Sequence, residues 1–146
     1  MNERDIEREM AAAVGGVSLA HIRRLEALGV PLRSIATLGA ELPPFGVSRV
    51  VWLPRGLYEP RPHGEPAVIV PVPAAERDLG SLGLVDLLAF RSSEPSLWAW
   101  RVGSGWCLGE WLLGDDELVV VQDPVRWLAH AGKALCIVNW DAPASF

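Results

Sequence analysis

The stretch LWAWRVGSGWCLGEW, residues 97–111, places four tryptophans in fifteen positions. Side chains alternate between the two faces of an extended strand, so Trp98 and Trp100 share one face while Ala99 and Arg101 share the other. Each indole has about 150–250 Å² to bury, which stabilises by several kcal/mol at about 25 cal/mol per Å². Exposing four such rings would cost more than the net stability of about 5–15 kcal/mol that such a domain has. The stretch therefore predicts the inside of a sheet.

The same argument places Trp127 and Trp140 in the core or at its edge. Trp106 and Trp111 are exceptions, because they flank a glycine-bearing turn where a ring can lie half out of the surface. Aromatic platforms that stack on bases normally lie in a basic groove, whereas Glu110, Asp115 and Asp116 near these two indoles are acidic. Because of their position at the turn, we treat the two indoles as candidate contacts for a ligand or partner.

Six short segments rich in β-branched or aromatic residues predict about six strands. Short intervals between them favour hairpins and a mainly antiparallel, or mixed, sheet, with residues 59–66 as a hairpin loop. Asp123 and Pro124 predict the start of one late helix that ends at Gly132, between two strands that can pair in parallel. The predicted strands are 48–54, 66–72, 84–90, 97–102, 117–122 and 134–140.

The first 40 residues predict three helices, capped in turn by Asn2, by Ser18 and by a first-turn Pro31. Their apolar positions recur at helical spacing and therefore form a layer that must pack on the sheet. The expected fold is α+β, with an N-terminal helical layer on the sheet and one late helix. We expect a single domain over 1–146, helical in 1–40 and sheet in 47–141. The expected apolar positions are Ile6, Met10, Ala13 and Val14, then Leu19, Ile22, Leu25 and Leu28, then Leu32, Ile35 and Leu38.

Composition indicates a globular chain, since half of the 146 residues are apolar and 21% are charged. The charged start and the lack of an apolar run near the roughly 18 residues of a membrane span lead us to expect a soluble, cytoplasmic protein without membrane contact. Cys107 and Cys136 lie in apolar segments, which predicts reduced, buried thiols.

Positive charge is concentrated in residues 17–62, where six arginines stand against three glutamates, although the whole chain has a net charge of −5. Within it, SLAHIRRLEALGVPLRSIATLG (18–39) has the outline helix, glycine-containing turn, helix. This segment resembles the paired helices beside the DNA-reading part of MerR-type regulators. The resemblance implies a DNA-binding alternative with Arg23, Arg24 and Arg33 as candidate nucleic-acid contacts, while the acidic total does not favour nucleic acid.

No complete catalytic, metal or cofactor motif is present in the sequence. The histidines and cysteines lack the short ligand spacing of a zinc site, and no phosphate loop occurs. Ser104 lacks the glycine two positions before it that a nucleophile elbow requires. Asp86 is the notable carboxylate, because alternation places it on the face of Leu84, Leu88 and Phe90. Its carboxylate must lie at the solvent-exposed end of the strand or have a polar partner, for example an arginine.

Three further segments, GEPAVIVPV (64–72), GLVDLLAFRSSEPSLWAWRVGSGWCLG (83–109) and PVRWLAHAGKALCIVNWD (124–141), resemble replication-associated primase-like proteins of bacterial phage and plasmid elements. This chain lacks the D-x-D carboxylate pair and the zinc-binding cysteines of those enzymes. The resemblance therefore implies an accessory or fragment without polymerising chemistry, and it assigns no catalytic residue.

These observations lead us to expect a non-enzymatic accessory or protein-interaction domain of a phage- or plasmid-type mobile element, without cofactor or metal. Its partner would be another protein or a second copy. The first alternative is a DNA-binding module that uses the helical hairpin 18–39. The second is a small enzyme or ligand-binding protein whose pocket lies near Asp86, Trp106 or Trp111.

Overall fold

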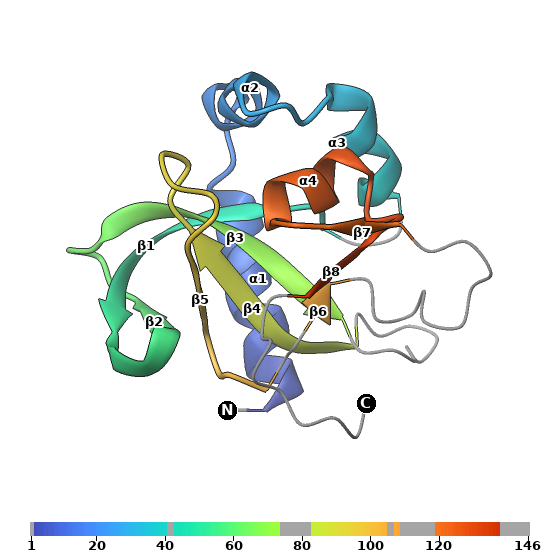
Figure 1. The fold of residues 1–146 in the computed structure, drawn as a ribbon. Helices are drawn as coiled ribbons and strands as arrows, with labels where there is room; N and C mark the ends of the chain where they lie inside the picture. Colours follow the sequence, from blue (N-terminus) through green and yellow to red (C-terminus); the bar gives the residue numbers. More distant parts are fainter. Residues whose placement is uncertain (1, 41–42, 74–82, 105–106, 109–118, 138–146) are drawn as a thin grey trace.

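The computed structural model describes residues 2–40, 43–73, 83–104, 107–108 and 119–137. Three helices come first, strands follow, and a fourth helix precedes the last strand (Figure 1). The helices are α1 (Glu3–Gly15), α2 (Leu19–Ala27), α3 (Leu32–Gly39) and α4 (Pro124–Ala129), with a 3-10 turn, η1, at Pro54–Gly56. The strands are β1 (Gly46–Leu53), β2 (Leu57–Pro60), β3 (Glu65–Pro73), β4 (Leu84–Phe90), β5 (Trp98–Trp100), β6 (Cys107–Leu108), β7 (Val120–Val121) and β8 (Leu135–Ile137).

The α+β class is confirmed, but the expected single sheet is wrong. Five strands close into a barrel in the order β1-β2-β5-β4-β3, and β6, β8 and β7 form a separate three-stranded sheet. All pairs in the barrel are antiparallel except β2 with β5. The predicted strands omitted β2 and β6, which are too short to give a periodic pattern, and β2 is the strand through which the barrel closes.

The predicted strands 48–54 and 66–72 pair antiparallel as expected, as β1 and β3, but the connection between them is more than the hairpin loop expected at 59–66, because it contains β2, which also pairs with β1. Val50 of β1 is paired with both Pro60 and Glu65, so the chain passes close to its backbone between these two residues. A Cβ added at Gly64 would lie 2.3 Å from the Val50 carbonyl oxygen. Only glycine allows this crossing, which joins the two strand pairs.

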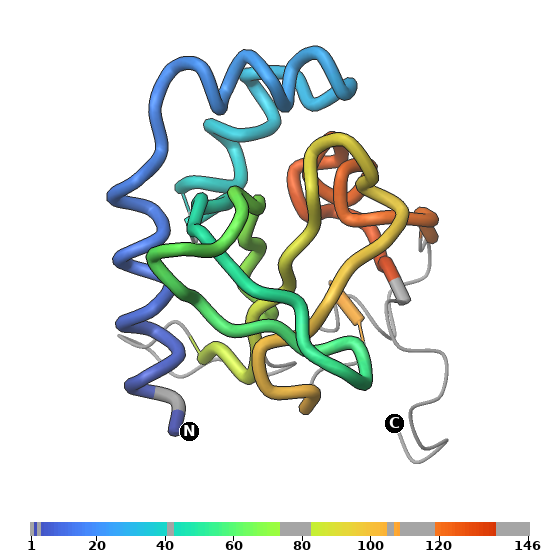
Figure 2. Tube along the Cα trace, turned by 90° about the vertical axis from the view of Figure 1, so that its left-hand side faces the viewer, coloured from blue at the N-terminus to red at the C-terminus, as the bar shows by residue number. Residues whose placement is uncertain are grey.

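Helix α1 lies along the outside of the barrel (Figure 2) and contacts β1, β3 and β4. Asn2 caps it as predicted, since its side chain accepts from the Asp5 backbone N–H at 3.0 Å. Ile6, Met10 and Ala13 are buried, while Val14 is exposed. The helix approaches β1 most closely at Gly46, where an added Cβ would lie 2.6 Å from Ala13.

Helices α2 and α3 form as predicted, on either side of a turn at Gly29, but their apolar faces need correction. Leu25, Ile35 and Leu38 are buried, whereas Leu19 and Leu32 are 60% and 55% exposed. Helical spacing places aliphatic residues on one side, but it does not say how far the surface beneath each helix extends. Helix α3 also packs on α4, to which the Ser34 hydroxyl donates at the Ala129 carbonyl, 2.7 Å away.

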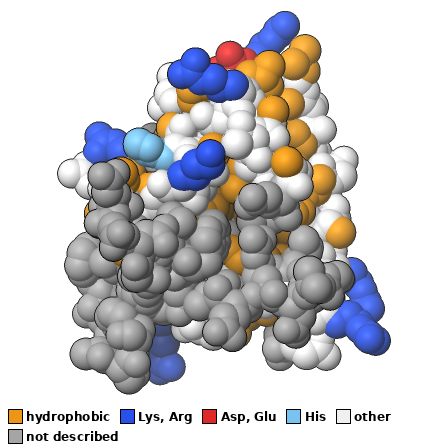
Figure 3. Space-filling view, turned by 90° about the vertical axis from the view of Figure 1, so that its right-hand side faces the viewer, with side chains coloured by type: hydrophobic (Ala, Val, Ile, Leu, Met, Phe, Trp, Pro, Cys, Tyr) orange, Lys and Arg blue, Asp and Glu red, His pale blue; other side chains and the backbone are white. Residues whose placement is uncertain are grey.

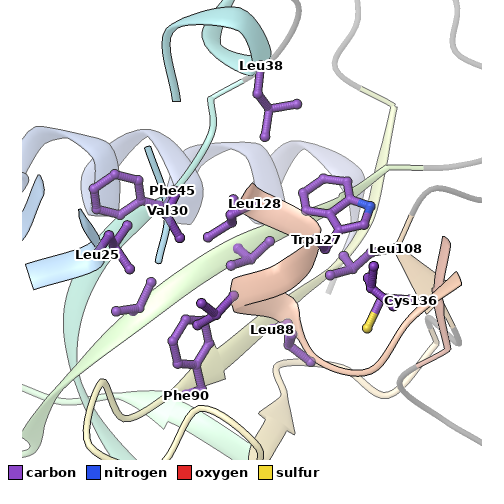
Figure 4. Packing of buried hydrophobic residues seen from close by; sticks show 14 of the residues in the cluster. Leu25, Val30, Leu38, Phe45, Leu88, Phe90, Leu108, Trp127, Leu128 and Cys136 are labelled. Carbon is purple, nitrogen blue, oxygen red and sulfur yellow. The ribbon is translucent and has the colours of Figure 1, made fainter. Parts of the chain in front are cut away.

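The last strand–helix–strand unit is as predicted, because β7 and β8 pair in parallel around α4. The Asp123 side chain caps α4 by accepting from the Arg126 backbone N–H at 2.9 Å. Trp127 is completely buried, and its indole N–H donates to the Ala134 carbonyl at 2.9 Å. In Figure 4, Trp127 and Leu128 extend from α4 toward buried residues of the strands.

The tryptophan argument is confirmed where the structure describes the rings. Trp100 and Trp127 are buried, and Trp98 is half-buried against the same core cluster, while Ala99 belongs to a second cluster on the other face. Trp106, Trp111 and Trp140 lie outside the described residues.

Candidate functional site

Asp86 is a buried structural acceptor. Its side chain is completely buried, and its carboxylate accepts four backbone N–H groups, from Leu87 (2.8 Å), Val102 (2.9 Å), Gly103 (2.8 Å) and Ser104 (2.9 Å). A carboxylate offers about four acceptor positions, and these four backbone donors are partners of this one. The paired alternative is therefore confirmed, with backbone N–H groups among the partners.

The strand face assigned to Asp86 needs correction, because Leu84 belongs to a different core cluster from Leu88 and Phe90. Val72 pairs with Asp86, and Pro73 pairs with Leu84, which leaves one residue of β4 unpaired between them. Such a bulge reverses the alternation on one side of it. Sequence alternation alone could not show this irregularity.

The three candidate nucleic-acid arginines are all exposed. Arg24 donates from Nε to the Ser92 hydroxyl at 3.2 Å, across 68 positions of sequence. Arg23 and Arg33 are exposed on α2 and α3. The charged side chains visible among the described residues in Figure 3 are mostly Lys and Arg.

A groove lies between α2 and the barrel, at the arginine that the sequence singled out. Its volume is about 80 Å³. Apolar side chains form most of its wall, and three polar side chains stand among them. The lining residues are Leu25, Phe45, Val47, Pro66, Ala67 and Val68, together with His21, Arg24 and Ser92.

The polar side of the groove offers hydrogen-bond donors. The Ser18 backbone N–H donates to His21 Nδ1 at 2.9 Å, so the proton of the neutral ring sits on Nε2. Arg24 is exposed and uses one donor on Ser92, which leaves the other guanidinium N–H groups for a further acceptor. An apolar group with a carboxylate beside it matches this surface in shape and charge.

Neither cysteine forms a disulfide, and both are buried, as predicted. Burial, with a smaller contribution from the Asp123 charge, raises the pKa of the Cys136 thiol to about 12. The thiol therefore stays protonated near neutral pH. Within the described ranges, no three His, Cys, Asp or Glu side chains cluster so as to hold a metal ion.

Sequence reasoning missed two features of the molecular surface. His21 lies three positions after the helix cap Ser18, and this spacing could have indicated its role. The other feature joins Trp52, Glu65 and Arg91, in which Glu65 accepts from both partners and the guanidinium lies 4.6 Å from the indole centroid. These three residues are distant in sequence, so no local pattern indicates their contact.

Comparison of the chain with protein-family models, with curated proteins and with solved structures finds no match. Among the described helices, none combines the length and apolar character that crossing a bilayer requires.

Proposed function

We propose that this chain is a non-catalytic accessory domain that binds a protein partner through the groove between α2 and the barrel. The partner would insert one aliphatic side chain and place an adjacent carboxylate against Arg24 and His21. The observation that carries this proposal is the apolar groove with donors on one side, formed in part by the segment 17–62 of net positive charge.

The size of the groove sets the kind of group that it accepts. A cavity of about 150 Å³ holds a benzene molecule, so about 80 Å³ suits one branched aliphatic side chain better than an aromatic ring. Protein interfaces concentrate their binding energy in a few anchors that fill such pockets. An arginine beside an apolar pocket adds specificity, because it rejects partners that bring a cation instead of a carboxylate.

DNA binding is the competing proposal, and it requires several arginines to contact phosphates, where the protein-partner proposal requires only Arg24. Phosphate contacts would use Arg23, Arg24 and Arg33 together and would weaken with salt. Most of the groove wall is apolar and would be left without a contact by a phosphate, whereas an aliphatic side chain fills it, which is why we favour a protein partner. The mobile-element setting that the primase-like resemblance implies stays a prediction.

The test uses the full chain and two short acetylated peptides, one with leucine between glutamates and one with leucine between lysines. We expect the acidic peptide to shift the backbone NMR signals of His21, Arg24 and Ser92 saturably, and the basic peptide to leave them unchanged. Arg24→Ala should weaken binding about tenfold, which corresponds to about 1.4 kcal/mol. Arg23→Ala is the matched control, because Arg23 is exposed on the same helix and does not line the groove.

Equal losses for the two arginine variants, or equal binding of the two peptides, would overturn the groove as the docking site. Salt-sensitive binding of duplex DNA that weakens for both variants would favour the competing proposal.

A further inference from the structure

A second cavity lies between α1 and the wall of the barrel, with a volume of about 230 Å³. Helix α1, strands β1, β2, β3 and β4 all contribute to it, next to the close approach of the helix at Gly46. It shares only Val47 with the groove, so the two sites are separate. Its lining includes Glu9 and Ala12 of α1, Ser48 of β1 and Tyr58 of β2.

Three polar side chains interrupt the apolar lining of this cavity. Tyr58 is only 2% exposed, and its side chain lines the cavity. Burial and the nearby Glu9 carboxylate raise the pKa of Tyr58, so the phenol keeps its proton and can both donate and accept. Ser48 contributes a second hydroxyl to the lining.

Glu9 supplies the charge of the cavity. One of its carboxylate oxygens accepts from Arg101 Nε at 2.8 Å, while Arg101 itself does not line the cavity. The ion pair holds the carboxylate in place and leaves its other oxygen to accept from a ligand. Arg101 offsets part of the Glu9 charge, but Glu9 brings only acceptor oxygens to the cavity, so an amine or hydroxyl gains a hydrogen bond from it and a ligand anion does not.

We propose that the cavity between α1 and the barrel binds a small single-ring compound that carries an amine or hydroxyl group. Its volume exceeds the about 150 Å³ that accommodates benzene, and its apolar lining suits the ring. Glu9 and Tyr58 receive the donor group of the ligand. The site is independent of the peptide groove and gives the chain a second, small-molecule specificity.

Tyr58 is the sole tyrosine of the chain, so a tyrosine-labelled sample reports on this cavity alone. With ring-¹³C-tyrosine in the full chain, we expect benzylamine and benzyl alcohol to shift the Tyr58 signals saturably at millimolar concentration. Benzoate should bind at least about tenfold more weakly, because its charge faces Glu9. Absence of a saturable shift with either donor probe, or tightest binding of benzoate, would overturn the proposal.

A filled cavity provides the matched comparison. Ala12 lines the cavity and Ala11 does not, although both are exposed on α1, so leucine is tolerated at either position without disturbing the core. Ala12→Leu should weaken benzylamine binding at least about tenfold, and Ala11→Leu should leave it unchanged. Equal binding in the two variants would show that the probe binds elsewhere and would overturn the assignment.

Discussion

Asp86→Asn should destabilise the fold strongly, although the substitution keeps the size and shape of the side chain. In the native chain one carboxylate oxygen accepts from Leu87 and Val102, and the other accepts from Gly103 and Ser104. Asparagine has a single acceptor oxygen, so its amide NH₂ must face two backbone N–H donors. Either orientation loses two of the four hydrogen bonds.

Each hydrogen bond to a charged group contributes about 1.5–3 kcal/mol, so two losses cost about 3–6 kcal/mol. Gly103 and Ser104 are exposed residues, and water can replace part of what their N–H groups lose. We therefore expect a loss near the lower end, about 3 kcal/mol. This is a large share of a net stability of about 5–15 kcal/mol.

The assay is urea unfolding followed by tryptophan fluorescence and circular dichroism, with Asp123→Asn as the control. Asp123 caps α4 through one backbone N–H, and asparagine caps a helix as well as aspartate does. The control should therefore change the stability by less than about 0.5 kcal/mol. With a slope of about 1.5 kcal/mol per molar urea, Asp86→Asn should lower the midpoint by about 2 M.

Equal midpoints for the two variants would refute the reasoning. The four N–H groups would then not depend on the carboxylate, and Asp86 would again be available for the ligand-binding alternative.

Two further predictions concern packing and pH. Gly64→Ala should destabilise the barrel by several kcal/mol or prevent folding, because its Cβ would overlap the Val50 backbone; Gly15→Ala, with nothing within 4 Å, should be neutral or stabilising when both are compared by thermal unfolding. The raised pKa of Cys136, about 12 against 9.0, means that the unfolded chain releases this proton first as pH rises. The free energy of unfolding should therefore fall above pH 9 by up to about 1.4 kcal/mol per pH unit from this thiol, while remaining unaffected by it below pH 9. Urea unfolding at pH 7 to 10.5 should show a shallower decline for Cys136→Ala, and identical declines would contradict the assigned cause.

Local sequence patterns were sufficient for the elements that depend on near neighbours. The caps of α1 and α4, the helices α2 and α3, and the parallel pair β7–β8 follow from capping residues, periodicity and connection length, which act over a few positions. The burial of Trp100 and Trp127 follows from the size of the indole, because a chain of this length cannot leave such rings in water.

The candidate sites depended on contacts that no local pattern records. Arg24 was recognised as a basic residue, but its position beside an apolar groove depends on Ser92, far along the chain. No sequence pattern indicates that Tyr58 and Glu9 line one cavity, because an isolated tyrosine and a glutamate in a helix are common features and only the fold brings these two together.

Backbone preferences and side-chain surface act between neighbouring residues, so the amino-acid sequence was enough to predict the helices, the longer strands and the burial of the large apolar rings. Only the tertiary structure decided that the strands close into a barrel, that β4 contains a bulge, and that Asp86 accepts the N–H groups of a distant turn. Closure and register depend on pairing between strands distant in sequence, where a shift of one residue reverses the faces without changing the composition.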